Sequence, residues 1–258
     1  MFKLDSLTQH NPIPIDENFL KKYDFIITLG AFAKNIKSDI CIHPFLDVST
    51  NLYIRYEAGT EEGVAALFLY EFYNGVKLRN YINELDYGYL TSETNISEEE
   101  MLHLKGLLSQ RRNPLLLIGS DFYIHPRNEN IINIFSNLLN HSKLNIVLLS
   151  KDNNMAYNIN TTNIALEPIG NLPENNGCII YVDYRLENEA ILKISNEFAR
   201  VWKVKNNDII KIKFDDFDIL VKCRLDDKFG GVIGILNYTK DIDCGYRYKQ
   251  VIITNKSN

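Results

Sequence analysis

The sequence predicts an α/β protein in which a layered domain with a parallel sheet precedes a small C-terminal β-barrel. Short, continuous apolar runs such as residues 23–30 end in glycine, which is typical of strands buried on both faces of a parallel sheet. Residues 115–149 have the pattern of a strand, an amphipathic helix and a second strand, a unit whose two strands are parallel. Beyond residue 178, short strands separated by turns dominate, as in a barrel or sandwich.

Composition limits the class of protein but not its function. The chain has 258 residues, of which 45% are hydrophobic, so it can bury a core in one large or two modest domains. The same hydrophobic content excludes disorder as the main description. The 28 Lys and Arg residues are outnumbered by 33 Asp and Glu residues, and this acidic balance argues against a dedicated nucleic-acid-binding protein.

The first part of the chain predicts a short lead-in followed by alternating strands and helices. Residues 1–21 are polar and interrupted by proline, so we expect an extended segment before an α/β domain at 22–150. After the strand at 23–30, a second apolar run at 51–56 leads into a helix that ends near Tyr73 and has Thr60 as its expected N-cap.

A capping box predicts where the next helix begins. Ser97 and Glu100 have the spacing at which each side chain binds the other residue's backbone amide, and apolar residues then recur on one helical face. A strand at 115–119, a helix around 131–139 and a strand at 144–149 complete the layered domain.

The second part of the chain predicts a small β domain. Residues 151–177 lose the periodicity and are rich in Asn, Gly and Pro, so we expect a linker or long loop there. The barrel domain covers residues 178–258 and contains one short helix at 197–204. Its expected strands are at 178–184, 191–194, 208–214, 219–223, 232–236 and 250–253.

The cysteines and histidines do not predict a metal site. The four cysteines, at positions 41, 178, 223 and 244, lack the short spacing typical of zinc and iron–sulfur sites. Cys41 and His43 form the one close Cys/His pair, and we expect a structural or loop role for them because no second pair is near. The other four histidines are scattered singly. We expect reduced thiols, a cytoplasmic protein and no membrane span, since no apolar run approaches roughly twenty residues.

Ligands of open α/β sheets bind at the carboxyl ends of the strands, so the residues that follow the predicted strands are candidates for a site. Ser120 and Asp121 directly follow the strand at 115–119, and Gly30 ends the strand at 23–30, so these three residues are the candidates for a pocket. The segment matches neither a nucleophile elbow nor a dinucleotide fingerprint, which favours loop hydrogen bonding for Ser120 and Asp121 and predicts no catalytic residue. In residues 59–63 (GTEEG), two carboxylates would repel a phosphate, so helix capping is the better interpretation.

Six short segments occur in an order that resembles one protein family. In the α/β part these are DFIITLGA at 24–31, GTEEGVAAL at 59–67 and NPLLLIGSD at 113–121. In the barrel they are ILKI at 191–194, EFAR at 197–200 and KNNDII at 205–210. Together they resemble the molybdopterin-oxidoreductase superfamily. The likeness is closer to its catalytically silent form within the large iron–sulfur subunit of NADH-quinone oxidoreductase, respiratory complex I.

The resemblance spans residues 22–258 and carries specific expectations. It implies a double-psi-like barrel and a shortened, non-catalytic accessory subunit of the peripheral arm of a complex I-type enzyme. The chain also differs from the family in two ways. The cysteines that hold iron–sulfur clusters are missing, and Asn207 replaces the glycine that is usual in the barrel turn. We therefore expect no redox centre and no cofactor. If a cofactor is bound, we expect it to be molybdopterin or a flavin.

The same resemblance names the expected partners and leaves an alternative function open. The partners would be other peripheral-arm subunits, especially an iron–sulfur subunit, together with a small electron-carrier protein, but not nucleic acid. The protein would lie in the cytoplasm, attached to the inner membrane only through its complex. The alternative is a pterin- or nucleotide-binding oxidoreductase fragment that a partner chain completes. A hydrolase or metal enzyme has no supporting motif, and an α/β interaction protein unrelated to the family is the remaining interpretation.

Overall fold

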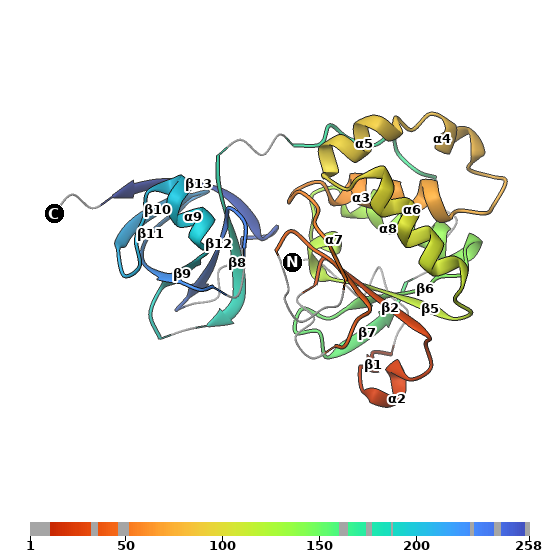
Figure 1. Cartoon of the computed structure of the whole chain (residues 1–258), viewed down its shortest axis with the longest axis horizontal. Coiled ribbons are helices and arrows are strands. Elements are labelled where there is room, and N and C mark those ends of the chain that lie inside the picture. Colours follow the sequence, from red (N-terminus) through yellow and green to blue (C-terminus); the bar gives the residue numbers. More distant parts are fainter. Residues whose placement is uncertain are drawn as a thin grey trace. The chain divides into compact units, whose positions relative to one another are not determined.

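The computed structural model describes residues 11–31, 36–45, 52–159, 165–173, 177–186, 188–227, 230–239 and 244–255. The chain divides into two compact units, one formed by residues 1–44 and 49–174 and the other by residues 45–48 and 175–258. The first unit contains a seven-stranded sheet with helices, and the second contains a closed six-stranded barrel (Figure 1). The predicted fold class is confirmed in both parts.

The sheet of the first unit is mostly parallel and has the order β1-β7-β6-β5-β2-β3-β4. Its parallel strands are β2 (Phe25–Leu29), β3 (Ile40–Ile42), β4 (Leu52–Ile54), β5 (Pro114–Ile118) and β6 (Asn145–Leu149). Two antiparallel strands, β7 (Met155–Asn158) and β1 (Ile13–Pro14), extend the sheet beyond β6. The predicted parallel pairing of β5 with β6 is confirmed, with Leu116 opposite Ile146.

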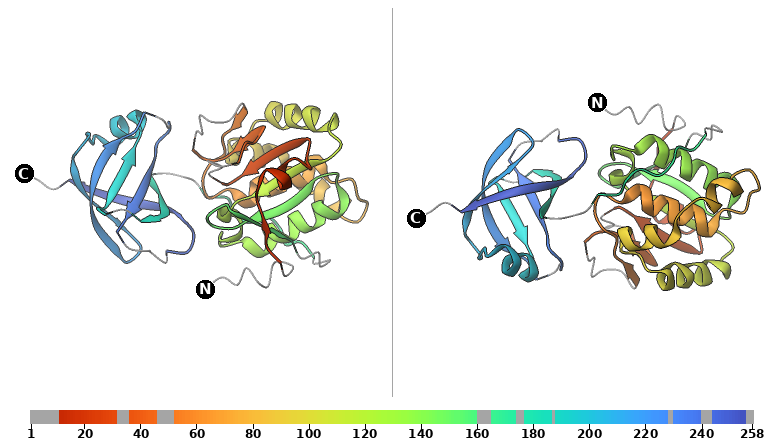
Figure 2. Two further views of the ribbon diagram at one scale, coloured as in Figure 1. Left: turned by 90° about the horizontal axis from the view of Figure 1, so that it is seen from below. Right: turned by 90° about the horizontal axis from the view of Figure 1, so that it is seen from above.

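Each face of this sheet is covered differently. The helices α3 (Glu61–Phe72), α6 (Glu98–Ser109) and α8 (Asn128–His141) lie on one face (Figures 1 and 2). The capping box at Ser97 and Glu100 is confirmed at the start of α6. On the opposite face, Phe19 of the short helix α2 (Glu17–Leu20) packs in one core cluster with Ile26, Leu117 and Val147. The central strands β2 and β5 are almost entirely apolar, as expected for strands covered on both faces.

Several elements lie where the sequence predicted none. Residues 1–21 were expected to be extended, yet β1 and α2 form there, and Asp16 caps α2 by accepting a hydrogen bond from the Phe19 amide. Strand β7 falls within residues 151–177, the expected linker. Helices α4 (Arg79–Asn83), α5 (Tyr87–Thr94) and α7 (Ser120–Tyr123) and strand β3 are also additional. All are short, and short elements depend on tertiary packing more than on periodicity.

The barrel closes in the order β10-β11-β9-β12-β8-β13. Its strands are β8 (Cys178–Leu186), β9 (Ile191–Ile194), β10 (Ile209–Phe214), β11 (Phe217–Leu225), β12 (Ile233–Tyr238) and β13 (Tyr248–Asn255). Each of the six predicted strands is present, and the predicted helix forms as α9 (Asn196–Trp202). Figure 2 shows the strands wrapped around a common axis.

The strand pairing of the barrel is two-fold symmetric. Exchanging β8, β9 and β10 for β11, β12 and β13 leaves every pairing and its direction unchanged. The two parallel pairs, β8 with β12 and β11 with β9, are then equivalent. This pattern, with two parallel pairs between strands that are not consecutive, is the double-psi-like barrel that the resemblance implies.

Two details show how the sequence meets the needs of this barrel. Alternate side chains such as Ile210, Ile212 and Val221 point into a common apolar core. In the turn before β10, Asn207 has a φ of 69°, a left-handed conformation that asparagine tolerates better than most residues. The replacement of the family's usual glycine by Asn207 is therefore compatible with the turn.

Candidate functional site

The candidate site lies at the carboxyl ends of β2 and β5, at the centre of the parallel sheet. From β2 the chain order runs one way through β3 to β4, and from β5 it runs the other way to β6, so the order reverses between β2 and β5. Ligands of open α/β sheets bind in the crevice at such a reversal. Here the Gly119 amide donates a 2.7 Å hydrogen bond to the Leu29 carbonyl, which holds the two strand ends together.

Two glycines make this close approach possible. A Cβ on Gly119 would overlap the carbonyl group of Gly30, so the two backbones are in direct contact. Gly30 has a φ of 63°, and a Cβ on it would lie 2.6 Å from ring atoms of Phe122. The space at the strand ends, where a ligand would contact the backbone, is therefore filled by the chain itself.

The structure brings together the three pocket candidates, Gly30, Ser120 and Asp121. Ser120 and Asp121 begin helix α7 rather than a loop, and both are buried, with 7% and 1% of their surfaces exposed. The expectation of a loop was wrong because four residues are enough for one helical turn, a length that shows no periodicity. All three candidates lie at the expected edge of the sheet, but all three are buried.

A histidine that the sequence did not single out for chemistry joins this site. His43 directly follows β3, and its Nε2 lies 3.9 Å from Oδ2 of Asp121, with both side chains buried. The His43 carbonyl accepts a 2.5 Å hydrogen bond from the Tyr53 hydroxyl. Cys41, its expected companion, lies within β3 and is buried. The pair was expected in a structural or loop role, and the structural part of that expectation agrees with its burial in and beside the strand.

A second buried histidine and carboxylate lie at the start of α3. Glu61 is fully buried, its Oε1 accepts a 3.4 Å hydrogen bond from the Tyr56 hydroxyl, and its Oε2 lies 3.7 Å from His125 Nε2. The Arg127 amide donates to His125 Nδ1, so the ring proton is on Nε2, 3.2 Å from the Gly59 carbonyl. Burial lowers the pKa of His125 below its ordinary value, which keeps the ring neutral.

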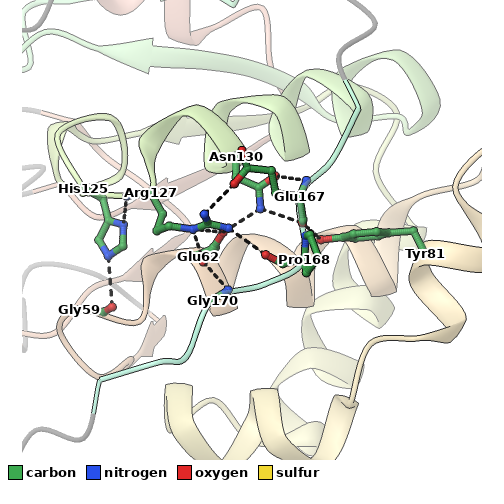
Figure 3. A network of polar contacts seen from close by, with 9 residues as sticks. All are labelled: Gly59, Glu62, Tyr81, His125, Arg127, Asn130, Glu167, Pro168 and Gly170. Atoms are coloured by element: carbon green, nitrogen blue, oxygen red, sulfur yellow. Dashed lines mark hydrogen bonds and ion pairs between the residues drawn. The ribbon is translucent and has the colours of Figure 1, made fainter.

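The neighbouring carboxylate, Glu62, is the centre of a larger polar network, drawn in Figure 3. Its oxygens accept hydrogen bonds from Arg127 Nε, from the Asn130 side-chain amide at 2.7 Å and from the Gly170 amide at 3.0 Å. Arg127 also bonds to Glu167 at 2.6 Å. This network joins α3, α8 and residues 165–173, so these last residues are bound to the α/β unit.

The interpretation of residues 59–63 as a helix cap needs correction. Thr60 precedes α3, but its hydroxyl donates a 2.6 Å hydrogen bond back to the Glu57 carbonyl and caps no amide of the helix. Glu61 and Glu62 instead bind side chains from other elements. Sequence spacing could not distinguish a local cap from partners that lie more than sixty residues away, such as Arg127 and Asn130.

In the conformation described, the residues at this edge leave no room for a pterin or flavin dinucleotide. The ring of Phe122 and the Gly30–Gly119 contact fill the space at the strand ends. The buried carboxylates of Asp121 and of Glu61, which accepts a hydrogen bond from Tyr56, lie beside it, and a carboxylate there would repel the phosphates of such a group. A ligand would have to displace the chain's own side chains to bind here.

Three further findings bear on function. In the part of the chain that the structure describes, no three or more His, Cys, Asp or Glu side chains are grouped so as to hold a metal ion. Within the same residues, no helix combines the length and the apolar character needed to cross a membrane. When the sequence is compared with known proteins, no family model matches it and no curated protein matches it.

The sequence did not predict the approach of His43 to Asp121, nor the contacts of Glu61 with Tyr56 and with His125. The usable signal was position, because His43 and Tyr56 each lie just beyond the carboxyl end of a parallel strand. His125 carried no such signal. Its role depends on α7, which places it beside Glu61 of a distant helix.

Proposed function

We propose that this chain is a non-catalytic accessory subunit of the peripheral arm of a NADH-quinone oxidoreductase of the complex I type. The single observation that supports this proposal is the joining, in one chain order, of a parallel α/β sheet and a symmetric double-psi-like barrel. This is the architecture that the collinear sequence segments imply. The fold alone would not select a function, so the proposal depends on fold and segment order together.

The interior of the candidate site supports a subunit without its own redox centre. The crevice between β2 and β5 is filled by Phe122 and by the contact between Gly30 and Gly119. Its buried ionisable groups interact with groups of the same chain, as in the pairs His43–Asp121 and His125–Glu61. Among the described residues, these groups are buried and bound within the chain, which supports a structural role for them.

In this role the protein would act through its surfaces. It would pack against an iron–sulfur subunit of the peripheral arm and help to form the docking face for a small electron-carrier protein. It would lie on the cytoplasmic side of the inner membrane, attached through the complex and without inserting into the bilayer.

Affinity purification of the tagged full-length chain from its native host, in mild detergent, tests the proposal. We expect complex I subunits in the eluate by mass spectrometry, and an isolated chain without absorption in the visible range. A Gly106→Ala variant should co-purify equally well, because Gly106 is an exposed helical position with open space around it. A monomeric chain that never co-purifies with complex I subunits would contradict the proposal.

The second candidate function is a pterin- or nucleotide-binding fragment that needs a partner chain to complete its site. One observation favours it: Gly30, Ser120 and Asp121 do meet at the point of the sheet where ligands bind. It predicts a chromophore or pterin fluorescence after denaturation of the purified complex. It also predicts that Ser120→Ala lowers the amount of bound ligand without changing the unfolding free energy by more than about 1 kcal/mol.

A further inference from the structure

One side of the barrel presents an exposed face built from β10, β11 and β13. Along these strands the inward residues are buried in the barrel core and the outward residues are exposed. We call the outward residues the β10–β11–β13 face; they are Ile209, Lys211, Lys213, Asp218, Leu220, Lys222, Arg224, Gln250, Ile252 and Thr254.

The face combines large aliphatic side chains with lysines. Ile209, Leu220 and Ile252 are 57%, 49% and 66% exposed. In the strand register each lies opposite a lysine: Ile209 opposite Lys222, Leu220 opposite Lys211, and Ile252 opposite Lys213. A single exposed aliphatic residue needs no explanation, but three on adjoining strands of one face indicate a contact surface.

The charge of the face has one predominant sign. Among its outward residues, the cations Lys211, Lys213, Lys222 and Arg224 outnumber one carboxylate, Asp218. Lys211 pairs with Asp218 at 2.8 Å and Arg224 with Glu189 at 3.5 Å, so Lys213 and Lys222 supply the surplus of positive charge. The face is therefore positive in a chain whose net charge is -5. Complementary charge across an interface selects the partner and speeds the encounter, so this face suits an acidic surface.

A cavity adjoins the face and shares three of its residues, Lys213, Gln250 and Ile252. It has a volume of about 710 Å³, and its other lining residues include Trp202, Phe214, Val251 and the carboxylate Asp215. Aromatic and aliphatic walls beside a charged rim are typical of the pockets that receive an anchoring side chain from a partner protein.

We infer that the β10–β11–β13 face docks an acidic protein, with the adjoining cavity receiving an apolar side chain of that partner. The acidic character of the partner follows from the face itself. The identity of the partner as a small electron-carrier protein rests on the proposed function. The inference adds to that function the chemistry of the docking surface.

Binding of the purified full-length chain to a plant-type [2Fe–2S] ferredoxin, a small acidic electron carrier, tests this inference. We expect binding by isothermal titration calorimetry that weakens as salt is added. The double variant Lys213→Glu/Lys222→Glu should weaken it about tenfold, since attraction becomes repulsion at two positions. Ile252→Ser, which removes the aliphatic group beside the cavity, should weaken it about fivefold.

A matched control separates this face from the charge of the whole chain. Lys77→Glu/Arg79→Glu changes the net charge by the same amount at two exposed positions of the α/β unit, and we expect less than a twofold effect. Circular dichroism should show all variants folded. Equal weakening by both double variants would overturn the inference, as would a single-stranded DNA oligonucleotide that binds this face more tightly than the ferredoxin.

The two proposals fail in distinguishable ways. Ferredoxin binding through the β10–β11–β13 face without co-purification of complex I subunits would reject the proposed function and retain the docking face. Co-purification that is unchanged by Lys213→Glu/Lys222→Glu, together with no ferredoxin binding, would retain the function and reject the face.

Discussion

The carboxyl edge of the sheet and the β10–β11–β13 face place charged side chains in opposite environments. At the sheet edge, Asp121, Glu61 and Glu62 are at most 1% exposed and lie beside groups of the same chain. On the barrel, Lys213 and Lys222 sit among exposed aliphatic residues. The charged residues at the edge where ligands of this fold class usually bind are buried here, whereas those on the barrel face are accessible to solvent.

The energetic scales of the two regions differ accordingly. Removing one partner of a buried ion pair leaves a charge without compensation and costs several kcal/mol, whereas an exposed pair contributes at most about 1 kcal/mol. The pair of Glu62 with Arg127 resembles a buried pair, because the Glu62 side chain is 2% exposed. The pair of Lys211 with Asp218 is an exposed pair, because the Asp218 side chain is 46% exposed. Four predictions test this contrast.

The largest effect is expected for Gly119→Ala. The added Cβ would overlap the Gly30 carbonyl, so the ends of β2 and β5 would have to separate. We expect a loss of about 4 kcal/mol or more in the free energy of unfolding, measured by urea denaturation. The control, Gly106→Ala, should instead stabilise the chain by about 0.5–1 kcal/mol, because Gly106 is an exposed interior position of α6. Similar values for the two variants would show that the strand ends are not in close contact.

Glu62→Ala should have the next largest effect. It removes the acceptor of hydrogen bonds from Asn130 and Gly170 and the ion-pair partner of Arg127. We expect a loss of about 2 kcal/mol in urea denaturation, less than for a fully buried pair because the Arg127 side chain is 37% exposed and can reach water. Glu129→Ala, an exposed carboxylate of α8, should change stability by less than about 0.5 kcal/mol. A loss from Glu62→Ala no greater than this control would place Glu62 outside the stabilising network.

The pH dependence of stability should reveal His125. Because burial lowers its pKa in the folded state, the unfolded chain binds a proton more readily below the ordinary value of 6.5. Stability should therefore fall as the pH drops below 6.5, by at most about 1.4 kcal/mol per pH unit from this group. Urea denaturation of His125→Gln across this range should show a flatter dependence than the parent chain.

The smallest stability effect is expected on the barrel. Leu220→Ser and Ile252→Ser alter exposed side chains, so each should change the free energy of unfolding by less than about 0.5 kcal/mol. The same Ile252→Ser variant should nevertheless weaken ferredoxin binding. A large loss of stability in either variant would remove the contrast between the two regions.

Periodicity and local chemistry predicted the regular elements well. The capping box at Ser97 and Glu100, the strand pair β5 and β6 and the six barrel strands each carry their signal within a few neighbouring residues. The short elements β3, α7 and α2 carry no such signal, because three or four residues are too few to show a period. They form since the larger elements pack around them.

The sequence predicted the position of the candidate site but not its contacts. Gly30, Ser120 and Asp121 could be placed at one edge of the sheet because strands of a parallel sheet end on the same side. Their burial could not be predicted, nor could the contacts of Glu61 with His125 and of Glu62 with Arg127, which join residues more than sixty positions apart.

The sequence by itself determined the order of an α/β domain and a barrel and the parallel pairing of β5 with β6, because these depend on local periodicity and on the geometry of chain connections. Only the tertiary structure decided that the strand ends close on each other through Gly30 and Gly119, and that an exposed positive face forms on β10, β11 and β13. The physical reason is that burial is a property of the whole packed chain: a carboxylate or a lysine has the same local signature whether its neighbours cover it or leave it in water.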